Sequence, residues 1–468
     1  AAMAEDAVLL HEDLFTEGLD KKPDEPSNVA QVMRHKRGDI DAGFAAADVI
    51  VEREYSTPTV HQGYIEPHAC TASMNEAGQA TVWCCTQGQF DVRKLTARVL
   101  GLDVGDIRVI PSEIGGGFGG KTTIYLEPVA IMLSEKAQRP VKIVMSRDEV
   151  FCASGPASAT KSRIKVGAKK DGTITAMYAW LAYEAGAFKG SPMMPGTFCV
   201  FAPYDVDNFF VEGFDVVVNK PKVAAYRAPG APQAAYAIES ALDELARELQ
   251  IDPVEFRLKN AVAEGSQAAY GPEFKAIGLK ECLQAALEHP NYRKSLGKNQ
   301  GRGVAVGFWF NAGMQSSVEV HVNEDGTVAV VEGNPDIGGS RASIAMMAAE
   351  TLGIPYEMVR VVVGDTESCG YSDVTGGSRV TFATGMAVVQ AAEDIIEQLK
   401  QRAAATWEID PQDVVWTDGQ AVSKTKTELE PLSLSAIAAT AARTGGPILG
   451  RASLNASGAG PGFSVNTA

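Results

Sequence analysis

An ordered series of structural elements occurs twice along this chain. The first copy opens with two β-runs around a turn that ends at Gly78, HACTASM-NEAG-QATVWCC, and the second with SSVEVHV-NEDG-TVAVVE around Gly326. Glycine supplies the left-handed backbone that such a short hairpin turn needs. Each hairpin is followed by a polar turn, a helical pattern, a short strand and a glycine-rich loop. The repeat predicts two similar domains of the α+β class, built from β-hairpins, helices and mixed sheets.

The correspondence between the two copies extends to single positions. Both helical patterns end in Leu-Gly, at Gly101 and at Gly353, and the next strand reads IRV from Ile107 and VRV from Val359. A third hairpin, around Gly172, lacks these following elements. Matches at equivalent places in two long segments are difficult to produce by chance, so we interpret them as an internal duplication.

Two long helices are predicted in addition. One follows the Pro- and Gly-rich loop AAYRAPGAPQ, and the other runs from about Thr384 to Ala405. The first keeps one apolar face, as its 3.6-residue spacing requires. That face is formed by Ala235, Ile238, Ala241, Leu242, Leu245 and Leu249.

Charge and composition exclude several classes of function. The net charge of -16 disfavours a nucleic-acid partner, because binding to phosphates requires clustered Lys and Arg. No run of eighteen apolar residues is present, so we expect no membrane span. The seven cysteines contain no CxxC pair, which argues against an iron–sulfur or zinc ligand set within this chain. An odd cysteine count and the lack of a basic leader in AAMAEDAVLLHEDL favour the cytoplasm.

The stretch GGGFGGKT, residues 115–122, satisfies two nucleotide-binding patterns at once. A P-loop lysine starts a helix, whereas here the next helical pattern begins only near Pro128, and the sister loop Thr375–Arg379 lacks the Lys-Thr pair. A dinucleotide fingerprint needs an acidic residue at a strand end about twenty residues on, but Glu135 falls in a helical pattern. We interpret both matches as incidental. The glycines themselves predict backbone N–H groups open to an anionic ligand.

Five motifs occur in a fixed order along the chain. They are TQ at Thr86-Gln87, GGGFGGK at 115–121, AYRAPGAPQ at 225–233, DIGGS at 336–340 and TGGSR at 375–379. With these motifs the chain resembles the molybdenum-binding subunit of the xanthine oxidase/aldehyde oxidoreductase family of molybdenum hydroxylases, in its split-subunit, nicotinate-dehydrogenase-like form. The resemblance implies two large α+β domains with a molybdopterin cofactor between them.

The same resemblance suggests domain boundaries. Residues 1–40 are expected to be the tail of a preceding small α/β domain, 41–280 the first molybdopterin-binding domain and 281–468 the second. The second domain is expected to be incomplete at its C-terminal end.

The family's catalytic positions transfer to four residues. Gln87 is expected to hydrogen-bond an oxygen ligand of molybdenum, and Phe118 and Gly119 to bring their backbone beside an oxo ligand. Arg227 is expected to stabilise negative charge that develops on the substrate. A structural salt bridge is the competing interpretation of Arg227.

The cofactor-binding residues implied by the resemblance are mostly glycines, which let backbone amides approach a charged group. The metal itself is expected to be held by the pterin dithiolene, without a side-chain ligand. The implied residues are Gly116, Gly117, Phe118, Gly119, Arg227, Gly338, Gly339, Ser340, Gly376, Gly377, Ser378 and Arg379.

The activity implied is oxidation of an electron-poor carbon with water as the oxygen source. The family's catalytic base is a glutamate of a GEP-type motif, which we do not find, so we expect it on a partner chain or a missing segment. The implied cofactor is the cytosine dinucleotide form of molybdopterin. The implied partners are a second molybdenum-subunit chain, an iron–sulfur subunit with [2Fe-2S] clusters and a flavin subunit with FAD.

The substrate class depends on departures from the family pattern. Thr122 stands where purine oxidisers carry Glu, and no second arginine lies near Pro195, so purines are disfavoured. The Arg227 loop also lacks the cysteine of copper-containing carbon monoxide dehydrogenases. We expect the substrate to be an aromatic N-heterocycle, with an aldehyde as the alternative.

The aromatic run at 308–310 either lines a substrate funnel or forms a buried strand. A P-loop NTPase and a noncatalytic cofactor-binding scaffold are the hypotheses of other classes.

Overall fold

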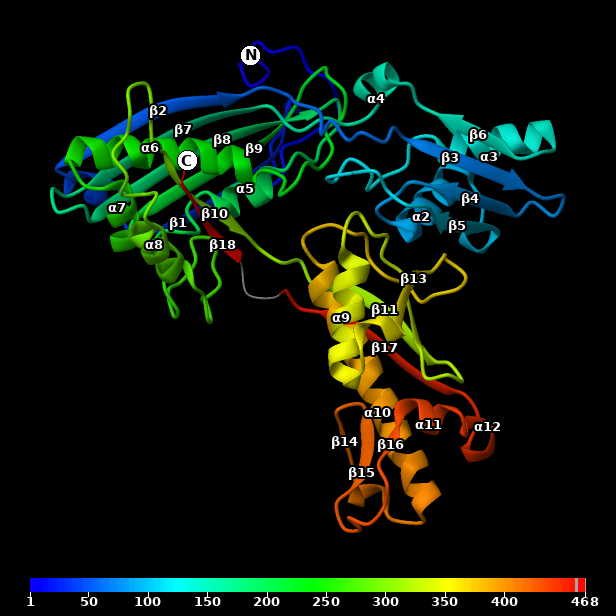
Figure 1. Cartoon of the computed structure of the whole chain (residues 1–468). Helices are drawn as coiled ribbons and strands as arrows, with labels where there is room; N and C mark the ends of the chain where they lie inside the picture. Colours follow the sequence, from blue (N-terminus) through cyan, green and yellow to red (C-terminus); the bar gives the residue numbers. More distant parts are fainter. Residues whose placement is uncertain (459–461, 468) are drawn as a thin grey trace. The chain divides into compact units, whose positions relative to one another are not determined.

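The computed structural model describes residues 1–458 and 462–467 (Figure 1). The chain divides into two compact units, each assembled from separate stretches of sequence. The first unit contains Ala1–Gly63, Phe151–Asn311 and the C-terminal strand; the second contains Tyr64–Val150 and the segment that begins at Ala312. Each unit is described by itself below.

The first unit is built on a five-stranded sheet in the order β1-β9-β8-β7-β2. All its pairs are antiparallel except β8 with β9, which is parallel. Residues such as Ile164, Leu181 and Val211 alternate along the strands and bury one face completely. The strands are β1 (Val29–Arg37), β2 (Val49–Thr57), β7 (Thr160–Ala168), β8 (Ile174–Gly186) and β9 (Phe209–Val217).

Helix α6 (Ala231–Leu249) packs across β2 and β7 on that buried face (Figure 1). The sequence predicted this helix, and its apolar residues Ile238, Leu242 and Leu245 are buried as expected. A proline stands in its first turn and Gln250 closes it in the left-handed conformation. The unit also contains α1 (Ile40–Ala45), α5 (Met193–Cys199), α7 (Pro253–Asn260), α8 (Leu279–Glu288) and the pair β10 (Val304–Trp309) with β18 (Gly462–Thr467); α4 (Arg147–Ala153) crosses the unit boundary.

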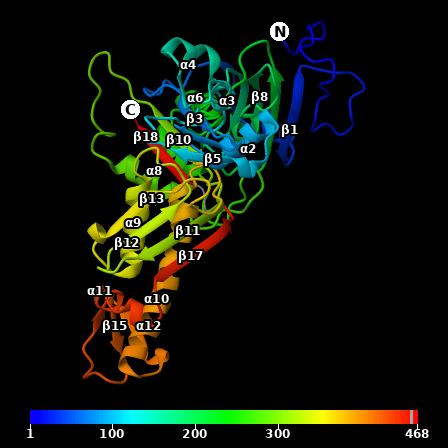
Figure 2. The ribbon, with the colours of Figure 1, turned by 90° about the vertical axis from the view of Figure 1, so that its right-hand side faces the viewer.

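The second unit contains both copies of the duplicated pattern, and their topologies are the same. The first module (residues 64–150) has the sheet order β5-β4-β3-β6, and the second module (from residue 312) has β13-β12-β11-β17. In each sheet the hairpin is antiparallel, its second strand pairs in parallel with the strand after the helix, and an antiparallel strand adds outside. Figure 2 shows β12, β11 and β17 side by side. The predicted duplication and the α+β class are confirmed.

Two crossover helices and two covering helices complete these modules. The crossovers are α2 (Gln89–Leu100) and α9 (Ser340–Leu352), and both end at a left-handed glycine. The covering helices are α3 (Glu127–Ala137) and α10 (Gly385–Trp407), the latter near its predicted position. The strands are β3 (Ala69–Met74), β4 (Ala80–Cys84), β5 (Ile107–Pro111), β6 (Val141–Val144), β11 (Met314–Val322), β12 (Val328–Glu332), β13 (Val359–Val363) and β17 (Ile448–Ala456).

The second module carries an insertion between α10 and β17 that the first module lacks. It is a small sheet in the order β14-β15-β16, followed by two short helices. The elements are β14 (Val414–Thr417), β15 (Gln420–Ser423), β16 (Leu432–Ser433), α11 (Leu434–Ala438) and α12 (Ala441–Thr444). Single turns occur at η1 (Val104–Asp106), η2 (Tyr356–Met358), η3 (Val380–Thr384) and η4 (Pro411–Asp413).

The predicted domain boundaries divide the chain differently from these contacts. Both repeated modules lie in one compact unit, although the boundary at residue 280 assigns them to different domains. Strand β1 falls within the predicted tail 1–40, yet it pairs along its length with β9. The boundaries stay a prediction. Within the described part of the chain, no helix combines the length and the apolar character needed to cross a membrane.

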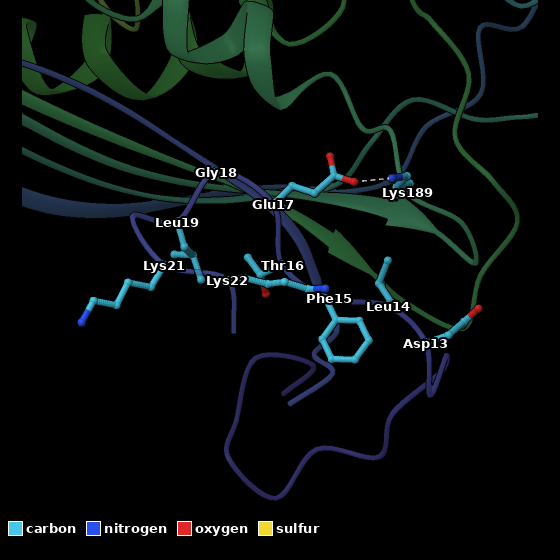
Figure 3. A pocket seen from close by; sticks show the side chains of 10 residues that line it. All are labelled: Asp13, Leu14, Phe15, Thr16, Glu17, Gly18, Leu19, Lys21, Lys22 and Lys189. Carbon is cyan, nitrogen blue, oxygen red and sulfur yellow. Dashed lines mark hydrogen bonds and ion pairs between the residues drawn. The ribbon is translucent and has the colours of Figure 1, made fainter. Parts of the chain in front are cut away.

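The segment before β1 lines an open pocket of about 520 Å³ in the first unit (Figure 3). Glu17 lies on its wall and forms an ion pair with Lys189 at 2.6 Å. Leu10 and Leu14 pack against a small buried cluster beside it. No residue of the predicted site lines this cavity.

Candidate functional site

Four loops of the second unit follow the carboxyl ends of parallel strands. The loop at 86–88 follows β4, 115–121 follows β5, 336–340 follows β12 and 375–379 follows β13. Ligands of sheets with parallel strands commonly bind at this end of the strands. The duplicated topology therefore places four of the five predicted motifs at equivalent positions.

Gln87 joins two of these loops. Its buried side-chain oxygen accepts hydrogen bonds from Gly119 N at 2.9 Å and Lys121 N at 3.2 Å, and its Nε2 donates to Thr375 O at 2.8 Å. Its backbone N donates to Lys121 O at 2.9 Å, and its backbone O accepts from Thr375 N at 2.7 Å. The structure thus brings Gln87, the GGGFGGK loop and the TGGSR loop together.

The GGGFGGK loop depends on backbone conformations that favour glycine. Gly116 has φ 93° and Gly119 has φ 102°, while Phe118 adopts φ 54° although it is not glycine. A Cβ on Gly117 would lie 2.5 Å from Gln87 Oε1. Phe118 leaves 42% of its surface exposed. A strained non-glycine residue whose side chain is exposed is typical of a functional loop.

The buried side chain of Lys121 anchors this loop. Its side chain is fully buried, and its Nζ lies 2.5 Å from Glu66 Oε2 and 5.0 Å from the centre of the Tyr64 ring. The same Glu66 oxygen accepts a hydrogen bond from Gly115 N at 2.8 Å. A P-loop lysine must reach outward to phosphates, which Lys121 does not do. The structure gives no support to the P-loop hypothesis.

The DIGGS loop is organised by Asp336. Its carboxylate accepts hydrogen bonds from Gly338 N at 2.8 Å, Ser340 N at 3.1 Å, Ser340 Oγ at 3.0 Å and Arg341 Nε at 3.0 Å. Burial raises the pKa of Asp336, but the hydrogen bonds from Gly338 and Arg341 outweigh it and lower the pKa to about 2. Gly338 and Gly339 are exposed at the start of α9, with φ 133° and 92°.

The TGGSR loop ends at a buried arginine, Arg379, which follows the exposed Ser378. Gly377 and Ser378 are left-handed, with φ 68° and 58°, and a Cβ on Gly376 would make an ordinary contact with Val374 Cγ1 at 3.9 Å. Arg379 is completely buried. It donates to Gly313 O and Asp373 O at 2.8 Å, to Ser316 Oγ at 2.5 Å and to Gln315 O. The structure places Arg379 beneath the loop, so any contact of its side chain with a cofactor stays a prediction.

Arg227 belongs to the first unit, whereas Gln87 and the glycine loops belong to the second. Its side chain is exposed and has no hydrogen-bond or ion-pair partner among the described residues. The backbone of both Arg227 and Ala228 is left-handed, with φ 21° and 57°. The salt-bridge interpretation of Arg227 finds no partner within this part of the structure.

Sequence reasoning missed several acidic residues at the predicted loops. Glu66 and Asp336 hold glycine loops, and Glu332 lies at the end of β12 just before the DIGGS loop. Glu332 is fully buried, with Asn334 N donating to Oε2 at 2.6 Å and no partner for Oε1 in the described structure. Burial raises the pKa of Glu332 to about 8. The only sequence signal was the position of each acid beside a strand end or a loop glycine.

The structure tests only one of the two interpretations offered for the aromatic run at 308–310, that of a buried strand. Phe308 is buried and packs against Phe274 and Phe463, as expected for a strand of the core. Trp309 and Phe310 are half-buried and stack with ring centres 4.5 Å apart.

The chemistry of the loops fits a bulky anionic cofactor. Among the described residues, no group of three or more His, Cys, Asp or Glu side chains could hold a metal. The loops instead offer left-handed glycine backbone, which allows the close approach of a large ligand.

Comparisons with known proteins agree with this arrangement. Two family models, each described as a molybdopterin cofactor-binding domain, match residues 21–261 and 276–466. The probable hypoxanthine oxidase XdhD of Escherichia coli (strain K12) is 31% identical over 446 residues, covering 85% of this chain and 46% of that protein. The nicotinate dehydrogenase large molybdopterin subunit of Eubacterium barkeri is 32% identical over 291 residues, covering 61% of this chain and 65% of that one.

A solved structure agrees as well. The aldehyde oxidoreductase of Desulfovibrio gigas matches with a TM-score of 0.78 and 25% identity, covering 97% of this chain and 48% of that one. The chain spans about half the length of curated relatives such as XdhD, of which it covers 46%.

Proposed function

Because this chain belongs to the molybdenum-binding subunits of the xanthine oxidase family, with two molybdopterin cofactor-binding domains, we propose that it holds the molybdenum cofactor of a hydroxylase. The reaction is the oxidation of an electron-poor carbon with water as the oxygen source. The substrate is an aromatic N-heterocycle, and the alternative is an aldehyde. The main support for the proposal is that Gln87 forms five hydrogen bonds, which connect two glycine-rich loops.

Gln87 has the hydrogen-bonding capacity for a role beside the metal. A side-chain amide nitrogen carries two protons, and Thr375 O accepts one of them. The second proton can be donated to an oxygen of the bound cofactor. The oxygen atom of the amide is held by Gly119 N and Lys121 N, which fixes the orientation of the whole group. Such a preoriented donor stabilises charge without reorganisation during the reaction.

The bound molybdopterin supplies the two-electron redox chemistry and the activated water oxygen. The chain contributes the loops that bind the cofactor. The loop residues expected to hold the cofactor are Gly116, Gly117, Phe118, Gly119, Gly338, Gly339, Ser340, Gly376, Gly377 and Ser378. Arg379 supports the last of these loops from below, through hydrogen bonds to backbone carbonyls. We propose the cytosine dinucleotide form of the cofactor.

Arg227 is the proposed group that stabilises negative charge on the substrate. Its guanidinium is permanently charged and not neutralised by a carboxylate of the described structure. The general base that removes the water proton is proposed to be a glutamate on a second molybdenum-subunit chain or on a segment absent from this sequence. An iron–sulfur subunit and a flavin subunit are the further proposed partners, and the cytoplasm is the proposed compartment.

Thr122 supports a substrate other than a purine.

Metal and nucleotide analysis of the purified native complex tests this function. We expect stoichiometric molybdenum and the release of a cytidine nucleotide on acid treatment. Gln87→Ala is expected to lower the molybdenum content, whereas Gln412→Ala, at an exposed glutamine whose side chain has no hydrogen bond in the described structure, is expected to leave it unchanged. Active complex without molybdenum contradicts the proposal.

A further inference from the structure

We propose that Glu332 is a positioning residue for the bound cofactor: its neutral carboxyl group holds the DIGGS and TGGSR loops in place, and loss of its proton loosens both. Glu332 ends β12, just before the DIGGS loop, and belongs with both loops to the second unit. The inference rests on the proposed function in one respect, because that function assigns the cofactor to these loops.

The carboxyl group of Glu332 lies in surroundings that suit an uncharged acid. The side chain is fully buried, Oε2 accepts a hydrogen bond from Asn334 N at 2.6 Å, and Oε1 has no partner in the described structure. An ionised carboxylate can only accept hydrogen bonds, so a buried oxygen without a donor is costly, whereas the protonated acid carries a donor of its own. Burial accordingly raises the pKa of Glu332 to about 8.

Asn334 connects the carboxyl group of Glu332 with the arginine beneath the TGGSR loop. Asn334 Nδ2 donates to Asp373 O at 2.6 Å, and the same oxygen accepts a hydrogen bond from Arg379 Nη1 at 2.8 Å. Asn334 Oδ1 accepts a hydrogen bond from Thr384 Oγ1 at 2.7 Å. One residue therefore receives the contact from Glu332 and shares an acceptor with Arg379.

The hydroxyl groups of Thr384 and Ser316 form a second route from Asn334 to Arg379. Thr384 gives its only hydroxyl proton to Asn334, so Ser316 Oγ is the donor in the hydrogen bond of 3.0 Å between the two hydroxyls. Ser316 Oγ in turn accepts a hydrogen bond from Arg379 Nη2 at 2.5 Å. All four side chains are buried. One member of a satisfied buried network cannot move without disturbing the others, so a change at Glu332 reaches the TGGSR loop.

A negative charge on Glu332 acts on the anchors of both loops. Burial is the main cause of the raised pKa of Glu332, while Asp336 adds to it and Arg379 opposes it. Because these interactions are mutual, an ionised Glu332 repels Asp336 and attracts Arg379. Asp336 holds the N–H groups of Gly338 and Ser340, and Arg379 lies beneath the TGGSR loop. Ionisation therefore displaces one anchor of each loop.

Two further titratable groups face Glu332. Arg341, at the start of α9, favours the charged form of Glu332, but it already forms ion pairs with Asp336 at 3.0 Å and with Glu113 at 2.7 Å. Cys369 lies in the loop after β13, and burial raises the pKa of its thiol to about 12, so it stays neutral. Of the groups that face one another here, Glu332 is the one that changes its charge near pH 8. Its positioning effect is complete at low pH and is lost as the pH rises through about 8.

Amide hydrogen exchange of the purified native complex at pH 6 and pH 9 tests the proposal, with each rate compared with the intrinsic rate at the same pH. The reporters are the hydrogen-bonded amides of Gly338 and Ser340 in one loop and of Thr375 in the other. In the wild type we expect about tenfold less protection at pH 9, because one pH unit above its pKa the charged acid exceeds the neutral acid by about ten to one. In Glu332→Gln, whose amide stays neutral, protection is expected to change by less than about twofold. Unchanged protection in the wild type, or an equal loss in Glu332→Gln, overturns the proposal.

A control within the wild type makes the test independent of any variant. Gly115 N donates to the carboxylate of Glu66 at 2.8 Å, in the first module. We expect this amide to keep its protection between pH 6 and pH 9, because its anchor is not part of the network around Glu332. Equal losses of protection at Gly115 and Gly338 contradict the proposal, since they show a general loosening of the unit.

Glu350→Gln is the matched control for net charge. It removes an exposed carboxylate from α9, the helix that follows the DIGGS loop. We expect this variant to lose protection at pH 9 as the wild type does. A Glu350→Gln variant that keeps its protection at pH 9 contradicts a specific role for Glu332.

The rate of molybdenum release connects the loops with the cofactor. We expect release from the wild type to be about tenfold faster at pH 9 than at pH 6, and release from Glu332→Gln to differ by less than about twofold. Loops that lose protection without faster molybdenum release contradict the part of the inference that concerns the cofactor. A complex without molybdenum contradicts the proposed function, and the exchange of Gly338 and Ser340 then still decides whether Glu332 positions the loops. A complex that contains molybdenum and keeps its protection at pH 9 contradicts only the role of Glu332.

Discussion

Gln87 and Thr375, which lie 288 positions apart, form two hydrogen bonds with each other. Thr375 N donates to Gln87 O at 2.7 Å, and Gln87 Nε2 donates to Thr375 O at 2.8 Å. One bond involves the backbone alone and persists after substitution; the other depends on the amide side chain. Because Gln87 also holds Gly119 N, its side chain sets the spacing of two loops from two modules.

Gln87→Ala is therefore expected to destabilise the second unit. The substitution leaves the N–H groups of Gly119 and Lys121 and the carbonyl of Thr375 without their buried partner. Such groups cost about 1–3 kcal/mol each, so we expect a loss of about 2 kcal/mol or more. Urea unfolding measures it, with Gln412→Ala as the exposed control. Equal midpoints for the two variants contradict this account.

Gly117→Ala tests the steric requirement of the loop. The new Cβ would lie 2.5 Å from Gln87 Oε1, so Gln87 or the loop must shift. We expect a destabilisation of about 1–3 kcal/mol, as for other overpacked sites, together with a lower molybdenum content. Gly105→Ala is the matched control because its Cβ would meet no atom within 4 Å. A stable Gly117→Ala variant with full molybdenum content would show that the loop has room.

Loss of Glu66 is expected to destabilise the protein more than loss of its ion-pair partner Lys121. Lys121 is fully buried, whereas the Glu66 side chain is 32% exposed. Glu66→Ala leaves an unpaired charge in the interior, at a cost of about 3–5 kcal/mol. Lys121→Met leaves a carboxylate that water can reach, so its cost is expected to be smaller. Unfolding of the two single variants and the double variant measures this order, and the reverse order contradicts it. ATP binding is expected to be absent in every variant.

Glu332 predicts a dependence of stability on pH. Burial, the largest effect, raises its pKa from 4.5 to about 8, and Asp336 adds to this, while Arg379 and Arg341 oppose it. The folded state therefore prefers the protonated acid, whose stabilising contribution is complete below pH 4.5 and is lost as the pH rises through about 8. Over that interval the free energy of unfolding falls by about 1.4 kcal/mol per pH unit from this group.

Glu332→Gln removes this dependence because the amide is neutral at every pH. We expect the variant to match the wild type near pH 5 and to exceed its stability progressively up to pH 8. Urea unfolding at several pH values measures the difference between the two proteins. A constant difference across this range would show that Glu332 does not titrate there in the folded state.

The sequence predicted the elements whose signals are local. Hairpin glycines such as Gly78 and Gly326 determine a turn through their own backbone, and the apolar face of α6 follows from residue spacing alone. The duplication could be predicted as well, because the same order of hairpin, helix, strand and glycine-rich loop occurs twice along the chain.

The partners of the site residues could not be predicted, because they arise from the three-dimensional fold. Lys121 meets Glu66 across 55 positions, and Gln87 meets Thr375 across 288. No pattern within a single sequence relates such positions. The sequence likewise identified Arg379 as a site residue without showing that it is buried beneath its loop.

The two modules share a topology but secure their glycine loops with different acids. Glu66 holds a loop of the first module, and Asp336 holds one of the second. Each acid acts within its own module, so one of these loops can acquire substitutions while the other keeps its anchor. The two loops are thus anchored independently, whereas the hydrogen bonds between Gln87 and Thr375 make the first module depend on the second at this position.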